Sequence, residues 1–390
     1  MNLLHLRLTQ FRAHTASGLD AAPGVNLLVG PNGAGKTNLL EALGYLCLGK
    51  SFLASSDQHA VQRGADHFVV EGTFAGEARP EVALRLAFVP GEGKRAFANG
   101  APLERLTSLV GRVPLVVLSP ADYDLTAGGP SERRRFLDTV LSQAYPVYLD
   151  DLVKYRRALR QRNALLQQLR RSRQAPASAL DAWDEEIAVL GGRLMDRRAA
   201  FLDRFSGFVA EAYDLLDSPG GHPELAYAPS ARPEAAGPEA GSAEDALRQA
   251  LARTRRRGVE LGRTLVGPHL DEVAFRLDGF DVRPYASQGQ HRTFALAVRI
   301  AEALFFRDHL DEPPILLLDD VFGPLDPDRT ALVLRLLASG ALGQSFISAA
   351  RAEPFEGLVP FESDDHARFH VEQGAVSPLQ ASLLPTPSPP

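Results

Sequence analysis

The stretch Gly30-Pro31-Asn32-Gly33-Ala34-Gly35-Lys36-Thr37 decides how the rest of the chain is interpreted. It has the form G-x-x-x-x-G-K-T, which is the pattern of a phosphate-binding loop. The residues before it, 25 to 29, form a short apolar run typical of a buried strand. The residues after it, 37 to 48, carry leucines at helical spacing, and Gly49 is suited to end the helix. Strand, glycine loop and helix in this order predict a binding site for a nucleoside triphosphate.

Each residue type in this loop has a role in holding phosphate. The glycines allow successive backbone N–H groups to converge on the β-phosphate, and the helix N-terminus adds a favourable dipole. The Lys36 side chain can reach the β- and γ-phosphates, and the Thr37 hydroxyl group can bind Mg²⁺. The residues that we expect to contact the nucleotide here are Gly30, Pro31, Asn32, Gly33, Ala34, Gly35, Lys36, Thr37 and Asn38.

The composition of the 390-residue chain is that of an ordinary globular protein, with 45% hydrophobic and 23% charged residues. This length predicts two or three structural units. The longest apolar runs are too short to span a bilayer, and the first residues lack the layout of a signal peptide. The single cysteine, Cys47, allows no disulfide framework within one chain, which suits the cytosol. We therefore expect a cytoplasmic protein without a membrane partner.

The first third of the chain is expected to form strands separated by turns, and Asn99-Gly100 carries a hairpin signal. The expected strands are 3–8, 25–29, 68–74, 82–89 and 113–118. The pattern changes after residue 130, where Ser131 is suited to cap a helix. Spacing and composition then predict helices at 148–169, 180–216 and 244–257, and a loop at 217–242. The two longer helices are expected to pair as an antiparallel hairpin.

A second motif, Ile315-Leu316-Leu317-Leu318-Asp319-Asp320, is an apolar strand that ends in two acidic residues. A nucleotide site requires such a strand beside the phosphate-binding loop. Asp319 would hold the Mg²⁺ shell, and Asp320 would orient or deprotonate the attacking water. The two motifs lie about 280 residues apart, much farther than in a compact P-loop kinase or small GTPase, where they would fall within about one domain.

This wide spacing, with a helical insertion, resembles the ATP-binding-cassette heads of DNA-repair and chromosome-structure proteins. The stretch Ser287-Gln288-Gly289-Gln290, followed by a helix at 292–306, resembles the cassette signature sequence. Residues 322–326 follow the acidic pair at the place of the cassette D-loop. The resemblance implies an α/β fold: a P-loop ABC-type ATPase head, lobe I, with a mainly helical lobe II and no long coiled coil. The domains that we expect are 1–127 and 301–375 for lobe I, 128–300 for lobe II with the signature motif, and 376–390 as a disordered tail.

Three further stretches together resemble the RecF family of bacterial DNA replication and repair proteins. They are Phe11-Arg12, Gly128-Gly129-Pro130 with Arg133 to Asp138, and Gly267-Pro268-His269-Leu270-Asp271. The resemblance covers about residues 1 to 375. It implies an ATPase that dimerises with ATP, binds duplex DNA near single-stranded gaps, and acts with RecR and RecO to load a recombinase.

The resemblance also implies roles for particular residues. Residues 30–37, Arg12, Asp319 and Asp320 would form one half of an ATP site. Ser287, Gln288, Gly289 and Gln290 would cap the γ-phosphate bound to the opposite subunit, and Asp326 would lie at the dimer seam. The cofactors implied are ATP and Mg²⁺.

The chain also departs from the cassette pattern at three positions. Asp320 stands where a glutamate is common, and this side chain is one methylene shorter, so we expect slow hydrolysis. No histidine occupies the switch position after residues 344–348, which leaves Ser348 as the nearest polar candidate. A Q-loop glutamine is missing near Ser119, and Gln62 is an alternative that the sequence does not place.

The charge of the chain is unevenly distributed. The net charge is -6, yet residues 130–174 contain eleven Lys and Arg residues against four Asp and Glu residues. Arginine clusters suit the phosphate backbone of nucleic acid, so this asymmetry favours duplex DNA without strong sequence preference. A second cluster of arginines follows at 253–263. The DNA contacts that we expect are Arg133, Arg134, Arg135, Arg156, Arg157 and Arg160.

The leading interpretation is an ATP-dependent DNA-binding repair protein with weak, DNA-stimulated ATPase activity. Two alternatives remain open at this point: the nucleotide-binding subunit of a transporter, and a clamp in which ATP joins two heads with negligible hydrolysis. The spacing disfavours a small-molecule kinase. The roles of His269 and Asp271 stay open, and a lone histidine is more often structural than functional.

Overall fold

The computed structural model describes residues 1–54, 56–76, 80–171, 177–216, 221–231, 241–323 and 325–379. The chain divides into two compact units. Unit 1 consists of Met1–Asp122 and Leu296–Pro390, and unit 2 consists of Tyr123–Ala295. Helix α8 (Gln288–Leu310) begins in unit 2 and ends in unit 1.

Unit 1 contains an antiparallel sheet with the strand order β2-β1-β4-β5-β6-β7. Its strands are β1 (Asn2–Phe11), β2 (His14–Asp20), β4 (Phe68–Ala75), β5 (Val82–Val89), β6 (Gly93–Ala98) and β7 (Ala101–Pro102). The predicted hairpin joins β6 to β7, and its two turn residues, Asn99 and Gly100, both have positive φ. Positive φ at both central residues is what a two-residue hairpin turn requires.

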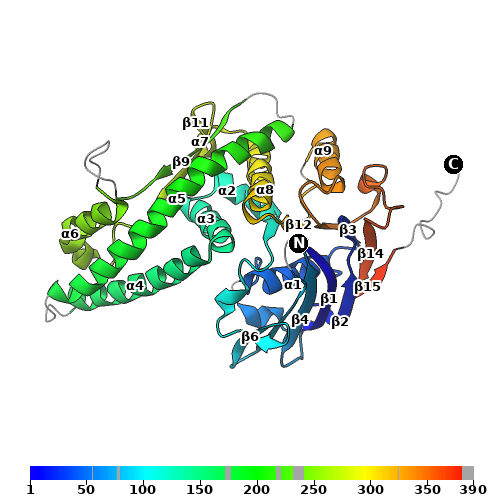
Figure 1. Cartoon of the computed structure of the whole chain (residues 1–390), viewed down its shortest axis with the longest axis horizontal. Helices are drawn as coiled ribbons and strands as arrows, with labels where there is room; N and C mark the ends of the chain where they lie inside the picture. The colour runs from blue at the N-terminus through cyan, green and yellow to red at the C-terminus, as the bar shows by residue number, and fades with distance from the viewer. Residues whose placement is uncertain are drawn as a thin grey trace. The chain divides into compact units, whose positions relative to one another are not determined.

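Unit 1 also contains a mostly parallel sheet with the strand order β15-β14-β3-β13-β12-β8, in which only β15 is antiparallel. Its strands are β3 (Val25–Val29), β8 (Leu115–Leu118), β12 (Ile315–Asp319), β13 (Ser345–Ala349), β14 (Ala367–Glu372) and β15 (Ala375–Pro378). Helix α1 (Lys36–Leu48) contacts strands of both sheets and is buried along most of its length (Figure 1). Helix α9 (Pro327–Ala338) follows β12.

The order of the parallel strands brings the glycine loop and the acidic pair to the same edge of the sheet. Strand β13 lies between β3 and β12, and all three strands are parallel. Their residues are almost wholly buried, as expected for a parallel sheet that is covered on both faces. Because the carboxyl ends of parallel strands meet at one edge, the segments that follow β3, β13 and β12 are brought together there.

Unit 2 is mainly helical. Its helices are α2 (Tyr123–Ala127), α3 (Pro130–Ala144), α4 (Pro146–Arg171), α5 (Asp181–Leu215), α6 (Ala243–Leu261) and α7 (Val282–Tyr285). Helices α4 and α5 lie side by side in opposite directions, as the sequence predicted, and α6 packs against both (Figure 1). A three-stranded sheet joins β9 (Pro223–Ala228), β10 (Glu272–Leu277) and β11 (Phe280–Asp281). Short 3-10 helices in the described part lie at Asp57–Ala60, Leu106–Leu109, Pro120–Asp122, Ala177–Leu180 and Glu353–Phe355.

The structure corrects three local predictions. The segment 217–242 is not only a loop, because β9 pairs with β10 through contacts distant in sequence that its composition does not indicate. Helix α3 is capped by Gly129 with Pro130 in the first turn, so Ser131 lies inside the helix. Residues 376–378, predicted as tail, belong to β15, and residues 380–390 of the predicted tail lie outside the described residues.

None of the helices in the described ranges is long and apolar enough to cross a membrane.

Candidate nucleotide site and basic helical surface

The glycine loop between β3 and α1 is held closely by its surroundings. A Cβ atom at Gly30 would lie 2.1 Å from the backbone oxygen of Val371, so only glycine fits against β14 there. Gly35, with φ of 110°, precedes the first residue of α1. The Lys36 ammonium group donates hydrogen bonds to the backbone oxygens of Gly30 (2.7 Å) and Pro31 (2.9 Å). The loop therefore wraps around its own lysine.

The electrostatic surroundings of Lys36 come from burial and from the acidic pair. Burial lowers the pKa of the Lys36 ammonium group, whereas the negative charges of Asp320 and Asp319 oppose that shift. Both carboxylates are thus close enough to act on the loop lysine. Asn38 lies in the first turn of α1, where its backbone N–H donates to the Gly35 oxygen.

A hydrogen bond joins the two motifs that the sequence separates by about 280 residues. The Thr37 hydroxyl group donates to the carboxylate of Asp319 at 2.7 Å. Asp319 is buried, and Asp320 is exposed with a positive φ of 51°. Asp319 thus faces the loop, and Asp320 is presented toward solvent immediately after it.

Ser348, at the end of β13, completes this arrangement. Its hydroxyl group donates to the same Asp319 oxygen at 2.7 Å and accepts from the Asp320 backbone N–H at 3.1 Å. Ser348 is buried. The residue that the sequence left as the nearest polar candidate at the switch position therefore contacts both acidic residues.

Arg12 is engaged with residues outside the loop. Its guanidinium group forms two hydrogen bonds of 2.7 Å with the Glu41 carboxylate and a third with the backbone oxygen of His59. The hydrogen bonds to Glu41 raise the pKa of Arg12. Ser51 also donates to Glu41, which is fully buried on α1. In this structure Arg12 therefore fastens the end of β1 to α1.

His14, which sequence reasoning did not flag, contacts the glycine loop directly. Its ring is fully buried, with Nε2 3.1 Å from the Gly35 oxygen and Nδ1 2.7 Å from the Gly374 oxygen. The Gly374 backbone N–H in turn donates to the oxygen of Ala34. His14 and the β14–β15 turn together brace the loop. No motif could have shown this, because the partners are backbone atoms remote in sequence.

The signature stretch begins helix α8 with a reciprocal cap. The Ser287 backbone N–H donates to the side-chain oxygen of Gln290 (2.8 Å), and the Gln290 N–H donates to the Ser287 hydroxyl group (3.2 Å). All four residues from Ser287 to Gln290 are exposed. A Cβ atom at Gly289 would come only to 3.9 Å of the Ser287 hydroxyl oxygen. Packing within the described part of the chain therefore does not require glycine here.

Asp326 caps helix α9. Its carboxylate accepts a hydrogen bond of 2.9 Å from the Arg329 backbone N–H, and the side chain is half exposed. This local role accounts for an aspartate at the position. The other carboxylate oxygen pairs with the Arg329 guanidinium group at 3.4 Å.

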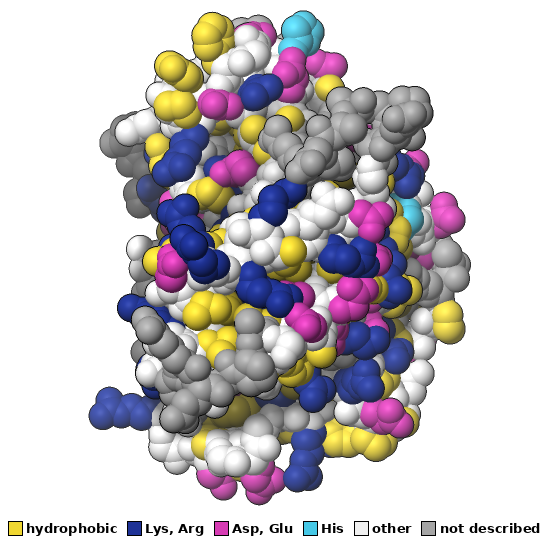
Figure 2. Space-filling view, turned by 90° about the vertical axis from the view of Figure 1, so that its left-hand side faces the viewer, with side chains coloured by type: hydrophobic (Ala, Val, Ile, Leu, Met, Phe, Trp, Pro, Cys, Tyr) yellow, Lys and Arg dark blue, Asp and Glu magenta, His cyan; other side chains and the backbone are white. Residues whose placement is uncertain are grey.

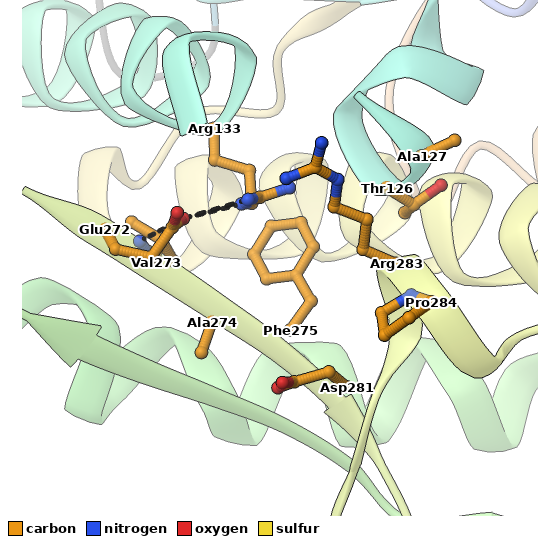
Figure 3. A pocket seen from close by; sticks show the side chains of 10 residues that line it. All are labelled: Thr126, Ala127, Arg133, Glu272, Val273, Ala274, Phe275, Asp281, Arg283 and Pro284. Carbon is orange, nitrogen blue, oxygen red and sulfur yellow. Dashed lines mark hydrogen bonds and ion pairs between the residues drawn. The ribbon is translucent and has the colours of Figure 1, made fainter. Parts of the chain in front are cut away.

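The structure corrects the expectation that Arg133 contacts DNA. Its side chain is only 6% exposed and forms an ion pair of 2.9 Å with Glu272. It also donates to the backbone oxygen of Gly128 and lies over the Phe275 ring. Figure 3 shows Arg133 in the wall of a pocket of about 500 Å³, pointing toward Glu272 and across Phe275. We call this cavity the balanced pocket, because its charged lining residues are Arg133, Arg283, Glu272 and Asp281.

The other arginines predicted to contact DNA are more accessible. Arg135 is 72% exposed beside Glu132, and Arg156 is 58% exposed beside Asp138. Arg134 donates to the backbone oxygen of Asp271. Arg157 and Arg160 are exposed on α4 and form no ion pair with another described residue. In Figure 2 basic side chains gather over the face shown, with acidic side chains among them.

Several arginines of the basic segments are internal rather than superficial. Arg162 is buried and donates to Asp184 (2.6 Å) and to the Thr264 hydroxyl group (2.9 Å). Arg255, from the second cluster, pairs with the same Asp184. The local excess of positive charge read from the sequence is therefore partly neutralised inside unit 2.

The stretch Gly267 to Asp271 anchors the interior of unit 2. Buried Asp271 accepts hydrogen bonds from the Ser230 backbone N–H and from the Tyr227 hydroxyl group. The Tyr155 hydroxyl group lies 2.6 Å from Nδ1 of His269, and burial lowers the pKa of His269 to about 4. These contacts give the motif a structural role.

Comparisons with known proteins agree with this fold. The family model described as "RecF/RecN/SMC N terminal domain" matches residues 2–364. The solved structure of the recombination mediator protein RecF-ATPrS in the RecFOR pathway superimposes with a TM-score of 0.87 at 29% identity, covering 97% of this chain and 98% of that one. An Smc head bound to the C-winged helix domain of ScpA has a TM-score of 0.56 at 16% identity and shows the fold alone. The chain thus has the fold of an ABC-type ATPase head of the RecF/RecN/SMC class, and the residues that the structure describes contain no long coiled coil.

Sequence relatives narrow the assignment. The DNA replication and repair protein RecF of Salinibacter ruber is 49% identical, and the alignment covers 99% of this chain and 93% of the relative. RecF of Chloroherpeton thalassium is 39% identical, with 91% and 96% covered. The chain belongs to the RecF family, which confirms the sequence prediction. The transporter-subunit and small-molecule kinase alternatives are therefore set aside.

Proposed function

We propose that the chain is an ATP-dependent DNA-binding protein of recombinational repair. In this proposal ATP joins two copies of the chain, the dimer binds duplex DNA near single-stranded gaps, and slow hydrolysis releases it. The observation that carries the proposal is the hydrogen bond between Thr37 and Asp319, because it brings the loop motif and the acidic motif into one site. The relative described as RecF-ATPrS supports ATP as the nucleotide.

Residues 30–38 are proposed to hold the triphosphate of ATP. Backbone N–H groups of the loop and the N-terminus of α1 would bind the phosphates, and Lys36 would exchange its carbonyl partners for phosphate oxygens. Arg12 supports the site through α1 by its pairing with Glu41. We therefore propose an indirect role for Arg12, which differs from the nucleotide contact expected from the sequence.

Mg²⁺ fits the same place. The Thr37 hydroxyl group and the Asp319 carboxylate are hard oxygen ligands that already lie together. In the described residues no cluster of three or more His, Cys, Asp and Glu side chains could hold a metal. A Mg²⁺ ion here would therefore take its remaining ligands from phosphate and water, which is its usual behaviour at nucleotide sites. When bound, it would neutralise charge on the phosphates.

Asp320 is proposed to orient the attacking water. It is exposed directly after the buried Asp319, and Ser348 fixes its backbone through the hydrogen bond from the Asp320 N–H. Its shorter side chain reaches less far than glutamate, which supports slow turnover. Stimulation of this weak activity by DNA belongs to the same proposal.

The signature stretch is proposed to complete the site of a second copy. Ser287 and Gln290 are exposed at the start of α8, where a hydroxyl group and a helix N-terminus form an anion-binding surface. Glycine is a poor helix former, by about 1 kcal/mol relative to alanine in a helix interior. Since packing against the described residues does not require Gly289, close approach of another molecule is a physical reason for it. Asp326 is proposed to lie at the seam of this dimer.

DNA binding is proposed for the accessible arginines of unit 2. These are Arg134, Arg135, Arg156, Arg157 and Arg160. Contacts with the phosphate backbone would give binding that depends on salt and varies little with sequence. RecR and RecO are proposed as partners in recombinase loading, supported by family membership and by the relative described in the RecFOR pathway. We propose that the protein acts in the cytoplasm, where bacterial DNA lies.

A second candidate is a clamp in which ATP joins two heads with negligible hydrolysis. The short and exposed Asp320 side chain favours it. Measurement of phosphate release with and without duplex DNA separates the two, because the clamp releases no phosphate above background.

Sedimentation velocity with and without ATP and duplex DNA tests the leading proposal. We expect a monomer without nucleotide, a dimer with ATP, and co-sedimentation with DNA only when ATP is present. Identical sedimentation in all four conditions contradicts the proposal.

A further inference from the structure

Unit 2 contains a second cavity, between the N-terminal half of α3 and the middle of α4. It has a volume of about 250 Å³. We call it the basic pocket, because its charged lining residues are Arg134, Arg135, Asp138, Arg156 and Arg198. Four guanidinium groups and one carboxylate thus line a cavity large enough for a small anion. Outside the lining, Arg198 also lies 3.8 Å from the Asp271 carboxylate, and Arg135 pairs with Glu132.

The single carboxylate of the basic pocket is already satisfied. Asp138 accepts from Arg156 (2.8 Å), from Arg198 (2.8 Å) and from the Tyr148 hydroxyl group (2.6 Å). Its charge is therefore committed within the protein. Arg134 and Arg135 are left without a carboxylate in the lining, because Arg134 bonds to a backbone oxygen and Arg135 pairs with Glu132 outside it.

The floor of the pocket is rigid, and its rim is accessible. Arg198 is 2% exposed and is fixed by hydrogen bonds to Asp138, to the Tyr148 hydroxyl group and to the Pro268 backbone oxygen. Buried Tyr155 is fixed by its hydrogen bond with His269. Arg135 and Arg156, in contrast, lie mostly in solvent at the rim. The pocket therefore combines a fixed floor with exposed cations at the rim, where an anion can reach them.

The balanced pocket in the same unit lacks these properties. Its two arginines face two carboxylates, and Arg133 is paired directly with Glu272 (Figure 3). An anion there would meet no net positive charge. Of these two pockets, only the basic pocket has more guanidinium groups than carboxylates in its lining.

We infer that the basic pocket binds one phosphate group of the nucleic acid that unit 2 engages. Guanidinium groups in a fork geometry suit phosphate oxygens, and the fixed floor would place that phosphate at one defined position. The inference rests on the proposed function and sharpens it, because it distinguishes one phosphate position from the general basic surface. The phosphate comes either from the continuous backbone or from a strand end at a gap.

The first test uses inorganic phosphate as the probe, in a Lys36→Met background that disables the glycine loop. Phosphorus NMR should show broadening of the phosphate line, and Arg135→Gln/Arg156→Gln should reduce that broadening at least about fivefold. Arg170→Gln/Arg171→Gln removes the same charge from exposed positions of α4 outside the pocket and should retain the broadening. Equal broadening in both double variants overturns the inference.

The second test uses gapped duplex DNA with either a phosphate or a hydroxyl group at the 5′ end of the gap. The pocket variant should lower the slope of log affinity against log salt by about one per lost phosphate contact. If the slope falls only on the phosphorylated substrate, the pocket binds the phosphate at the strand end. If the slope falls equally on both substrates, the pocket binds a phosphate of the continuous backbone. An unchanged slope on both substrates overturns the inference.

The two tests separate the inference from the proposed function. Phosphate broadening that the pocket variant loses, in a chain that binds no DNA, supports the pocket and contradicts the DNA-binding proposal. Arg135→Lys/Arg156→Lys keeps the charge and removes the fork, so partial recovery of phosphate binding supports the guanidinium geometry. Thermal unfolding of each variant establishes that the fold is retained.

Discussion

The candidate nucleotide site of unit 1 and the arginines of unit 2 differ in how well the sequence predicted where their residues lie. In unit 1 the residues named by motifs converge: Thr37, Asp319 and Ser348 form one hydrogen-bonded group. In unit 2 the residues named by charge separate, because Arg133 and Arg162 are buried in ion pairs, whereas Arg135 and Arg156 face solvent. A motif at the end of a strand therefore predicts where its side chains lie. A local excess of arginines does not predict which of them are exposed.

The largest expected effect lies on the unit 1 side of this comparison. Lys36→Met removes the only long cation of the glycine loop, so ATP turnover should fall by about a thousandfold. A coupled phosphate-release assay measures the loss. Turnover at the level of the unaltered chain would show that the loop is not the site.

A smaller effect should separate the two acidic residues. Asp320→Asn should lower hydrolysis by about a hundredfold. ATP binding and dimerisation should persist, because the contact with Thr37 is made by Asp319. Nucleotide binding by fluorescence and dimerisation by sedimentation provide the controls. Joint loss of binding and hydrolysis would contradict this division of roles.

The signature stretch belongs to unit 2 yet is proposed to act on a second copy's nucleotide. Ser287→Arg places a bulky side chain there, and the ATP-induced dimer should weaken by about a hundredfold, on the order of 3 kcal/mol. Its monomers should still bind ATP. Sedimentation with ATP measures the change, and a dimer of unchanged stability would count against the composite site.

The division within the arginines can be tested by one matched pair. Arg133→Ala removes a side chain that is 6% exposed, with its ion pair to Glu272 and its contact with the Phe275 ring, so the free energy of unfolding should fall by about 2 kcal/mol. Arg135→Ala should change it by less than about 0.5 kcal/mol and should instead lower the salt dependence of DNA binding. Urea unfolding and salt titration measure the two effects. The reverse pattern would show that the buried and exposed sets are wrongly assigned.

The smallest expected effect is a loss of folding stability at acidic pH. The folded pKa of His269 is lowered to about 4 from an ordinary value near 6.5, so between these values the unfolded chain binds more protons. Stability from this group is therefore present at neutral pH and is lost as pH falls. We expect about 1–2 kcal/mol less stability at pH 5 than at pH 7. Urea unfolding across this range measures the loss, and His269→Gln should flatten that part of the profile.

The sequence was sufficient for the fold, and it named the loop residue Thr37 and the acidic residue Asp319 that the structure brings into contact. Strand β3, the glycine loop and α1 are contiguous, so their arrangement can be predicted from local pattern. Strand β12 ends in Asp319, and a parallel sheet leaves few places for such a strand beside the loop. The family resemblance supplied the signature stretch, whose exposed position the structure describes.

The remaining features depend on partners that local pattern does not contain. His14 meets backbone oxygens of Gly35 and Gly374, and β9 meets β10 more than 40 residues later. The burial of Arg133 follows from Glu272, which lies on another element. In each case the role of the residue depends on a neighbour in the folded structure that is remote in sequence.

The order of strands in unit 1 also governs how the protein can be made. Strand β3 carries the glycine loop and pairs with β13 on one side and β14 on the other, both of which follow residue 344. During synthesis β3 therefore remains without its native neighbours until most of the chain has left the ribosome. Unit 2 is continuous in sequence and does not have this restriction. The nucleotide site is thus among the last features to form, and its strand edge needs protection from aggregation until then.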